Sequence, residues 1–115
     1  NTTGDLGALM QATVQNAGLN VLKQYTGHGI GRTLHDGPAI PAHGQAKTGT
    51  ALETNQVLCL EAQVVTGSDQ VEVGSDGWSV KTKDGGLSAM FEYMVDVGKK
   101  QPLVLTETLD WDIIV

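Results

Sequence analysis

The chain has 115 residues, with 7 Lys and Arg against 13 Asp and Glu, which gives a net charge of -6 at pH 7. This length supports a single domain, since independent folding units most often contain roughly 100–150 residues. An acidic chain with scattered basic residues suits neither nucleic acid nor an anionic membrane surface, and we expect neither partner. No apolar run approaches the roughly 20 residues that a membrane-spanning helix needs.

The chain has a single cysteine, Cys59, so it cannot form an intramolecular disulfide. Since the sequence also shows no signal peptide, the cytoplasm is the expected compartment. We expect Cys59 to pack as a small apolar side chain, because its strand offers no basic neighbour that would lower its pKa. The chain opens on Asn1 rather than Met, which favours processing or a piece of a longer protein.

Residues 3–18 place apolar side chains at helical spacing. Thr3 or Asp5 is available as the N-cap, and Gly18 stands where a helix commonly stops. The pattern therefore predicts one amphipathic helix at the start of the chain.

After this helix we predict a short extended run over residues 19–25. Residues 26–54 hold all three histidines and most of the glycines, and we expect mainly loop there, with a short strand. Period-two patterns then predict strands at residues 56–65, 78–82, 87–97 and 102–106. Asp84-Gly85 is expected to make a hairpin turn between two of these strands. The predicted class is α+β, with one helix covering one face of a mostly antiparallel sheet and the other face open for a partner.

Two glutamates, Glu61 and Glu92, stand in predicted strands whose two faces both look apolar. An isolated buried carboxylate is costly, so it has to be protonated, paired or bound to a metal. For either glutamate alone a solvated or ion-paired strand residue is the more common situation. Two such residues on neighbouring strands favour a functional site.

A glycine-rich segment with two histidines, His28 and His35, covers residues 26–36. One interpretation is a phosphate-binding turn, but no Gly-Lys-Ser/Thr follows and the glycine spacing is not that of a dinucleotide site. The other is a histidine held by a tight loop beside Glu61 and Glu92. One imidazole with two carboxylates is a ligand set that suits Mn, Fe, Co or Zn.

The run from residue 25 to residue 41 closely resembles the glycine–histidine segment of methionine aminopeptidases, which have the pita-bread metallopeptidase fold. The resemblance continues through residues 58–61, 78–84 and 87–92, and only the tail at 110–115 lies outside it. It implies half of a pita-bread fold, formed as one domain over residues 1–115. That domain resembles the C-terminal, metal-ligand-bearing half of the family.

The resemblance implies hydrolytic removal of N-terminal methionine from peptides and nascent proteins, with two divalent ions (Co, Mn, Fe or Zn) in the family. Carried over residue by residue, the metal ligands are His28, Glu61 and Glu92. Glu92 would bridge the two ions, and Glu61 would also shuttle a proton.

The resemblance further implies a substrate-binding role for three residues. His35 would contact the substrate amide and help to stabilise the developing oxyanion. Leu34 and Trp78 would line the apolar pocket for the methionine side chain.

The family takes two more ligands, both aspartates, from strands that precede this region, and this sequence offers no counterpart. We therefore expect at most one ion in this chain alone, and completion by the missing N-terminal half or by a second copy. Two alternatives remain, a non-catalytic pita-bread-like peptide- or protein-binding module and a relative of aminopeptidase P or prolidase. The retained ligand residues argue against a non-catalytic binding module. The sequence of residues 32–35 resembles methionine aminopeptidases more than aminopeptidase P or prolidase.

Overall fold

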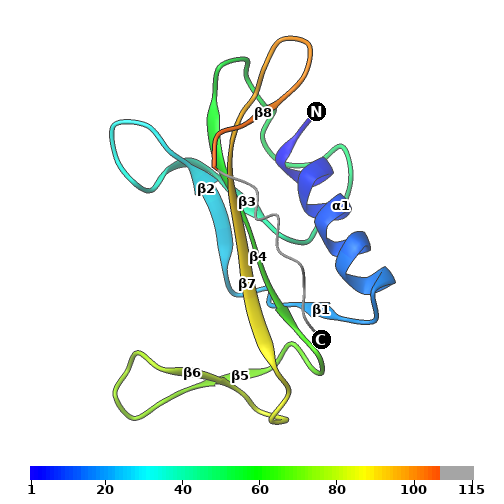
Figure 1. The fold of residues 1–115 in the computed structure, drawn as a ribbon, viewed down its shortest axis with the longest axis vertical. Coiled ribbons are helices and arrows are strands. Elements are labelled where there is room, and N and C mark those ends of the chain that lie inside the picture. The colour runs from blue at the N-terminus through cyan, green and yellow to red at the C-terminus, as the bar shows by residue number, and fades with distance from the viewer. Residues whose placement is uncertain (107–115) are drawn as a thin grey trace.

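The computed structural model describes residues 1–106 and shows one helix packed against a twisted antiparallel sheet (Figure 1). The helix, α1, spans Thr3–Asn16. The main sheet has the order β3-β2-β4-β7-β8, and β1 pairs with β4. The predicted α+β class is thus confirmed, whereas the tail at 110–115 falls outside the described residues.

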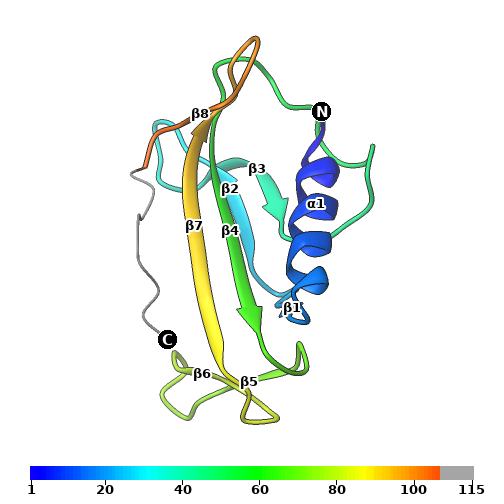
Figure 2. The ribbon, with the colours of Figure 1, turned by 45° about the vertical axis from the view of Figure 1, so that its right-hand side comes forward.

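A second, smaller sheet projects from one end of the main one (Figures 1 and 2). It is a two-stranded antiparallel pair of β5 (Val71–Val73) and β6 (Val80–Thr82). The strands of the main sheet are β1 (Asn20–Val21), β2 (Thr26–Gly29), β3 (Asp36–Pro41), β4 (Val57–Val65), β7 (Ser88–Asp96) and β8 (Leu103–Val104).

A capping box starts α1, with Thr2 as the N-cap. The Thr2 hydroxyl accepts from the Asp5 N–H at 3.3 Å, and the Asp5 carboxylate accepts from the Thr2 N–H at 2.8 Å. The prediction that Thr3 or Asp5 is the N-cap was wrong. The N-cap is Thr2, and Asp5 is its partner in the capping box. At the other end Gly18 has φ +76°, as expected for a glycine that stops a helix.

The helix packs directly on the backbone that follows β3. A Cβ at Gly7 would meet the backbone oxygens of Pro41 and His43, so only glycine allows this approach. The buried core lies between α1 and the sheet and consists mainly of Val21, Leu22, Ile40, Ala42, Leu58, Val64 and Val65. No helix within residues 1–106 is long and apolar enough to cross a membrane.

The glycine-rich stretch that was expected to be mainly loop contains two strands. β2 and β3 pair with each other, and β2 also pairs with β4. A Cβ at Gly27 would clash with the carbonyl oxygen of Cys59 on β4. The glycines that look like strand breakers in the sequence therefore serve here to let neighbouring backbones come close.

The predicted hairpin at Asp84-Gly85 is wrong. A turn does form, since Gly85 has φ +74° and its N–H donates to the Thr82 carbonyl at 3.4 Å. However, β6 pairs with β5 and β7 pairs with β4, so the turn does not join two neighbouring strands. The extended run predicted over residues 19–25 is a strand only at Asn20–Val21.

The helix covers one face of the main sheet, as Figure 2 shows. On its outer edge β7 pairs with β8 only at Val95 and Asp96. Within the described part of the chain, residues 88–93 of β7 have no strand partner on that edge. The face of the sheet opposite α1 also has no helix on it within residues 1–106, as the sequence predicted.

Candidate metal centre

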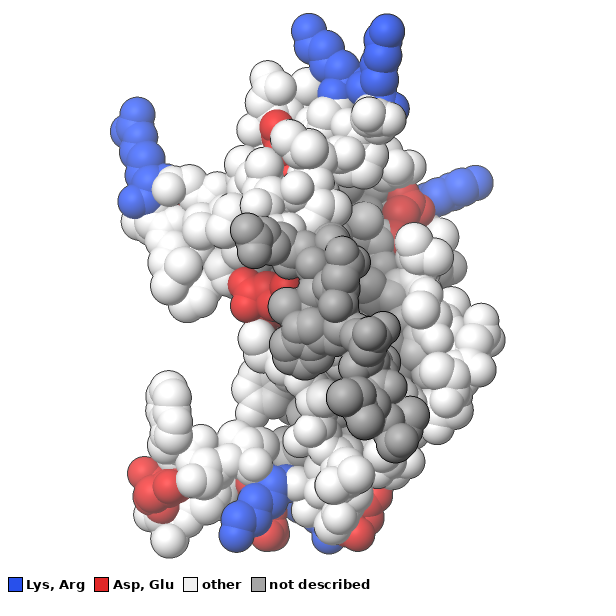
Figure 3. Space-filling view, in the orientation of Figure 1, with Lys and Arg blue, Asp and Glu red and all other residues white. Residues whose placement is uncertain are grey.

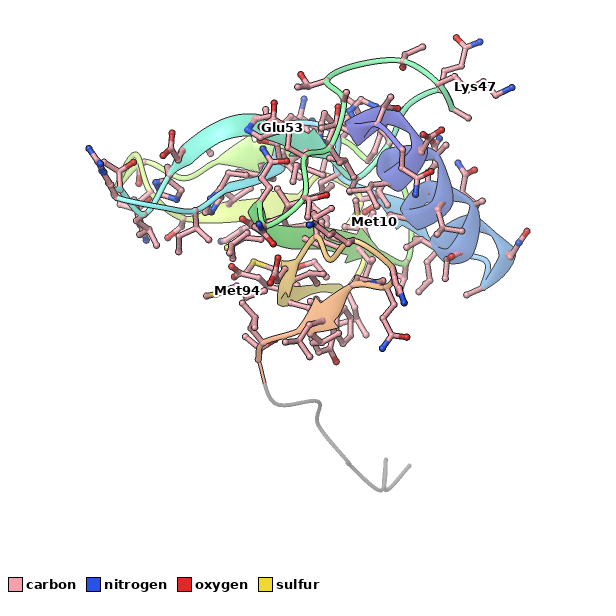
Figure 4. All side chains as sticks on the ribbon, turned by 90° about the horizontal axis from the view of Figure 1, so that it is seen from above. Met10, Lys47, Glu53 and Met94 are labelled. Atoms are coloured by element: carbon pink, nitrogen blue, oxygen red, sulfur yellow. The ribbon has the colours of Figure 1, made fainter. Side chains whose placement is uncertain are left out.

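Three neighbouring strands bring the predicted ligands together. The register places His28 of β2 opposite Cys59 of β4, and Glu61 of β4 opposite Glu92 of β7. Because alternate residues of a strand share one face, these four side chains lie on the same face of the sheet. Figure 4 shows Met94, the cross-strand partner of Cys59, on the side of the sheet away from α1, so the site lies on the uncovered face.

His28 and Glu61 are in direct contact. The His28 Nε2 lies 3.2 Å from the Glu61 Oε1, and their side chains are 13% and 14% exposed. The other ring nitrogen of His28, Nδ1, lies 2.8 Å from the Gly29 carbonyl oxygen, which can only accept a hydrogen bond. Nδ1 therefore carries a proton, and in the neutral ring Nε2 presents its lone pair to the carboxylate.

A lone pair that faces a carboxylate at this distance is unfavourable unless a positive charge is shared between them. Either a proton or a metal cation has to lie between the nitrogen and the oxygen. An imidazole nitrogen and a carboxylate oxygen are both common ligands of divalent transition ions. The residues present thus fit a divalent metal.

Glu92 and Cys59 lie near the same imidazole, in a group of possible ligand atoms that, among the described residues, does not include Glu61. One ligand atom from each of His28, Cys59 and Glu92 lies within 4.8 Å of the other two. The expectation that Glu92 has buried surroundings is wrong, because Glu92 is exposed beside the open edge of β7. Glu61 is mostly buried, as expected.

Cys59 is buried, as the sequence predicted, with 2% of its surface exposed. Burial, and then the carboxylates of Glu92 and Glu61, raise the pKa of the Cys59 thiol. The thiol is therefore neutral in the metal-free chain. Its place beside His28 and Glu92 was missed, although its two-residue spacing from Glu61 on a strand is the signal that puts both on one face.

The remaining predicted site residues lie on loops next to this cluster. The ring of His35 meets the ring of His28 edge to face, with centroids 4.4 Å apart. Leu34, on the same loop, is 66% exposed, and Trp78, in the turn between β5 and β6, is 87% exposed. Within residues 1–106 these two side chains therefore do not enclose a pocket.

The two loops project on the same side of the molecule (Figures 1 and 2). In the space-filling view a hollow lies between these projections, with acidic side chains at its inner wall (Figure 3). The open face of the sheet is thus accessible from this side.

A cavity of about 270 Å³ lies between the main sheet and the small β5–β6 sheet. Gln63 and Met90 line this cavity and are cross-strand partners. Each lies two residues from a candidate ligand on its own strand, Gln63 from Glu61 and Met90 from Glu92. Gln63 Nε2 donates to Glu61 Oε2 at 3.5 Å, and the Gln63 Oε1 has no hydrogen-bond partner among the described residues. A buried acceptor without a partner among the described residues and an apolar wall thus lie next to the candidate ligands.

Similar proteins were found by sequence. The chain is 36% identical to methionine aminopeptidase of Aquifex aeolicus over 106 residues, covering 90% of this chain and 41% of that protein. It is 38% identical to methionine aminopeptidase of Clostridium perfringens, covering 92% of this chain and 43% of that protein. The chain therefore spans about two fifths of the length of these relatives.

Solved structures give the same result. The methionine aminopeptidase of Thermotoga maritima superposes with a TM-score of 0.88 at 37% identity, over 93% of this chain and 43% of that one. The enzyme of Rickettsia prowazekii superposes with a TM-score of 0.85 at 35% identity, over 90% of this chain and 42% of that one. The fold is accordingly part of a pita-bread fold. Because the model of metallopeptidase family M24 also matches residues 1–99, the chain belongs to that family.

Proposed function

We propose that this chain forms the histidine- and glutamate-bearing part of the metal centre of a methionine aminopeptidase. The reaction is hydrolytic removal of methionine from the N-termini of peptides and nascent proteins. The observation that carries the proposal is the contact between His28 Nε2 and Glu61 Oε1, with Nδ1 already used by the Gly29 carbonyl. Membership of family M24 and the similarity to methionine aminopeptidases support it.

The proposed ligands are His28, Glu61 and Glu92. The hydrogen bond from Nδ1 to the Gly29 carbonyl keeps the His28 ring in the tautomer whose Nε2 lone pair is free to coordinate. Glu61 is held beside that nitrogen and can also take up and return a proton at its second carboxylate oxygen. A divalent ion bound there would polarise the scissile carbonyl and make water a better nucleophile.

We assign the loop residues to substrate binding. His35 lies edge to face with His28, where its ring can donate to an oxygen that becomes negative during attack. Leu34 and Trp78 offer exposed apolar surface on the two projecting segments. With the neighbouring cavity at Met90, they supply the apolar wall that a methionine side chain requires.

We further propose that the centre is completed by additional polypeptide. Three candidate ligands leave open positions on one ion and cannot by themselves hold a second, and the chain spans about two fifths of its relatives. The missing carboxylates would come from the rest of a longer protein, from a separate chain, or from a second copy. The metal is Co, Mn, Fe or Zn, and the expected compartment is the cytoplasm.

Metal titration by calorimetry, with elemental analysis, tests this proposal. We expect the isolated chain to bind at most one Co²⁺ or Mn²⁺ ion, and His28→Ala or Glu92→Gln to abolish binding. Glu61→Gln should weaken binding strongly. His43→Ala is the matched control, since His43 lies in the loop after β3 and outside the cluster. Unchanged binding in the His28 variant, or two tightly bound ions per monomer, would show that the site is wrongly assigned.

Peptide assays test the substrate. The isolated chain should release no more than traces of methionine from Met-Ala peptides, and addition of the remaining part of a similar methionine aminopeptidase should raise the rate. Preference for Xaa-Pro peptides would instead identify a relative of aminopeptidase P or prolidase. Full turnover by the 115-residue monomer would refute the need for completion.

A further inference from the structure

We propose that Cys59 supplies a sulfur ligand to the metal centre, so that the centre prefers thiophilic ions such as Zn²⁺, Co²⁺ or Cd²⁺ to Mn²⁺ or Mg²⁺. This inference rests on the metal centre proposed above and adds a fourth side chain to it. It also assigns a role to Cys59 beyond packing.

The positions of the donor atoms support the inference. The ligand atoms of His28, Cys59 and Glu92 all lie within 4.8 Å of one another. Metal–ligand bonds of about 2.0–2.3 Å place two ligands of one ion at most about 4.4 Å apart, so only a small adjustment is needed. The exposed Glu92 side chain is free to make it. Cys59 is fixed in the middle strand, opposite His28 on one side and Met94 on the other.

The chemistry of the buried thiol fits the same role. Coordination requires that the Sγ–H bond break, that the proton leave to solvent, and that a sulfur lone pair form the bond to the ion. A bound divalent ion would be the largest charge in the site and would favour the thiolate. With His28 and Glu92, sulfur then gives a mixed N, O and S donor set.

The competing role for Cys59 is purely positional. In that case the thiol keeps its proton, donates to the Glu92 carboxylate and holds it in place, without touching the ion. The two roles differ in one observable property, because only a coordinated thiolate gives a sulfur-to-metal charge-transfer absorption.

Absorption spectroscopy of the Co²⁺-loaded chain separates the two roles. Because Cys59 is the single cysteine, any thiolate-to-cobalt band in the near ultraviolet comes from it. We expect a band that saturates at the stoichiometry found by calorimetry and that is missing in Cys59→Ser and Cys59→Ala. Met94→Leu is the matched control, since it removes the sulfur directly opposite Cys59 and should leave the band unchanged.

Metal selectivity gives a second readout. The preference for Cd²⁺ over Mn²⁺, measured by competition, should fall roughly tenfold or more in Cys59→Ser. Binding that depends on His28 but shows no charge-transfer band would overturn the sulfur ligand and leave the metal centre standing. If the unaltered chain shows no metal binding that depends on His28, both the sulfur ligand and the metal centre are overturned. If the serine variant fails to fold by circular dichroism, the band of the unaltered chain still decides the question.

Discussion

Glu61 and Glu92 lie directly opposite each other in the antiparallel pairing of β4 and β7. Two like charges at opposed positions of a sheet repel, and of the two glutamates only Glu61 has a histidine nitrogen, His28 Nε2, beside its carboxylate among the described residues. The arrangement therefore disfavours the metal-free sheet and favours an ion between the strands.

Glu92→Gln should consequently stabilise the metal-free chain while it weakens metal binding. The expected gain is about 0.2–1 kcal/mol in the free energy of unfolding, measured by denaturant titration in the presence of a chelator. Glu72→Gln is the control, because Glu72 lies opposite Lys81 and its charge is favourable there. A loss of stability in Glu92→Gln would mean that the two carboxylates do not repel.

Asp76 should titrate far below an ordinary aspartate. The Ser79 hydroxyl and the N–H groups of Trp78 and Ser79 donate to its carboxylate and lower its pKa from 3.8 to about 2. Because the pKa of Asp76 is lower in the folded chain, its ionised carboxylate stabilises the turn at pH values above the ordinary aspartate pKa. This stabilisation is lost as the pH falls from about 4 towards 2.

Amide NMR shifts of Trp78 and Ser79 against pH would check this prediction, with a midpoint expected near 2. The same amides in Asp76→Asn should show no such transition. A midpoint at the ordinary aspartate value would contradict the hydrogen bonding of the turn.

Gly7→Ala should destabilise the fold. The new Cβ would lie 2.6 Å from the Pro41 carbonyl oxygen, and relief requires α1 to move away from the strand end. We expect a loss of about 1–3 kcal/mol in thermal or denaturant unfolding. The exposed helix position Gln15 is the control, since Gln15→Ala should change stability by less than about 0.5 kcal/mol. If Gly7→Ala and Gln15→Ala are equally stable, the helix does not approach the end of β3 as closely as described.

The isolated chain should self-associate through the open edge of β7. Within residues 1–106, the outer edge of residues 88–93 has no strand partner, and Leu87, Met90 and Phe91 at this edge are exposed. Phe91→Lys should shift sedimentation towards the monomer, because a charge on an edge strand opposes pairing. Leu9→Lys, on the exposed side of α1, should have no such effect. A compact monomer of the unaltered chain at micromolar concentration would count against association.

The long period-two strands and the single helix could be predicted because their patterns are local. Glu61 and Glu92 were expected on neighbouring strands, and the register places them directly opposite each other. The faces of β4 also follow from alternation, with Leu58 in the core and Glu61 on the other side.

Other features depend on contacts between distant segments and have no local signal. Gly27 looks like a strand breaker, yet it lies in β2 because the Cys59 carbonyl comes too close for any side chain. The exposure of Glu92 depends on what lies beyond the edge of β7, which no pattern within the strand reveals. The Asp84-Gly85 turn was correct as a turn and wrong as a hairpin, since the Asp84 carboxylate accepts from the Ser68 N–H at 2.6 Å and ties the turn to the loop after β4.

The first residues of the chain are held by the segment that precedes β4. The Asn1 carbonyl accepts from the Leu52 N–H at 3.0 Å, Thr2 forms a bridge with Ala51, and Asp5 accepts from the Lys47 N–H at 2.8 Å. Asn1 also lines a cavity of about 500 Å³ together with Leu52. Residues 1–5 and residues 47–52 therefore hold each other in place, and we expect the first helical turn to detach only together with the segment before β4.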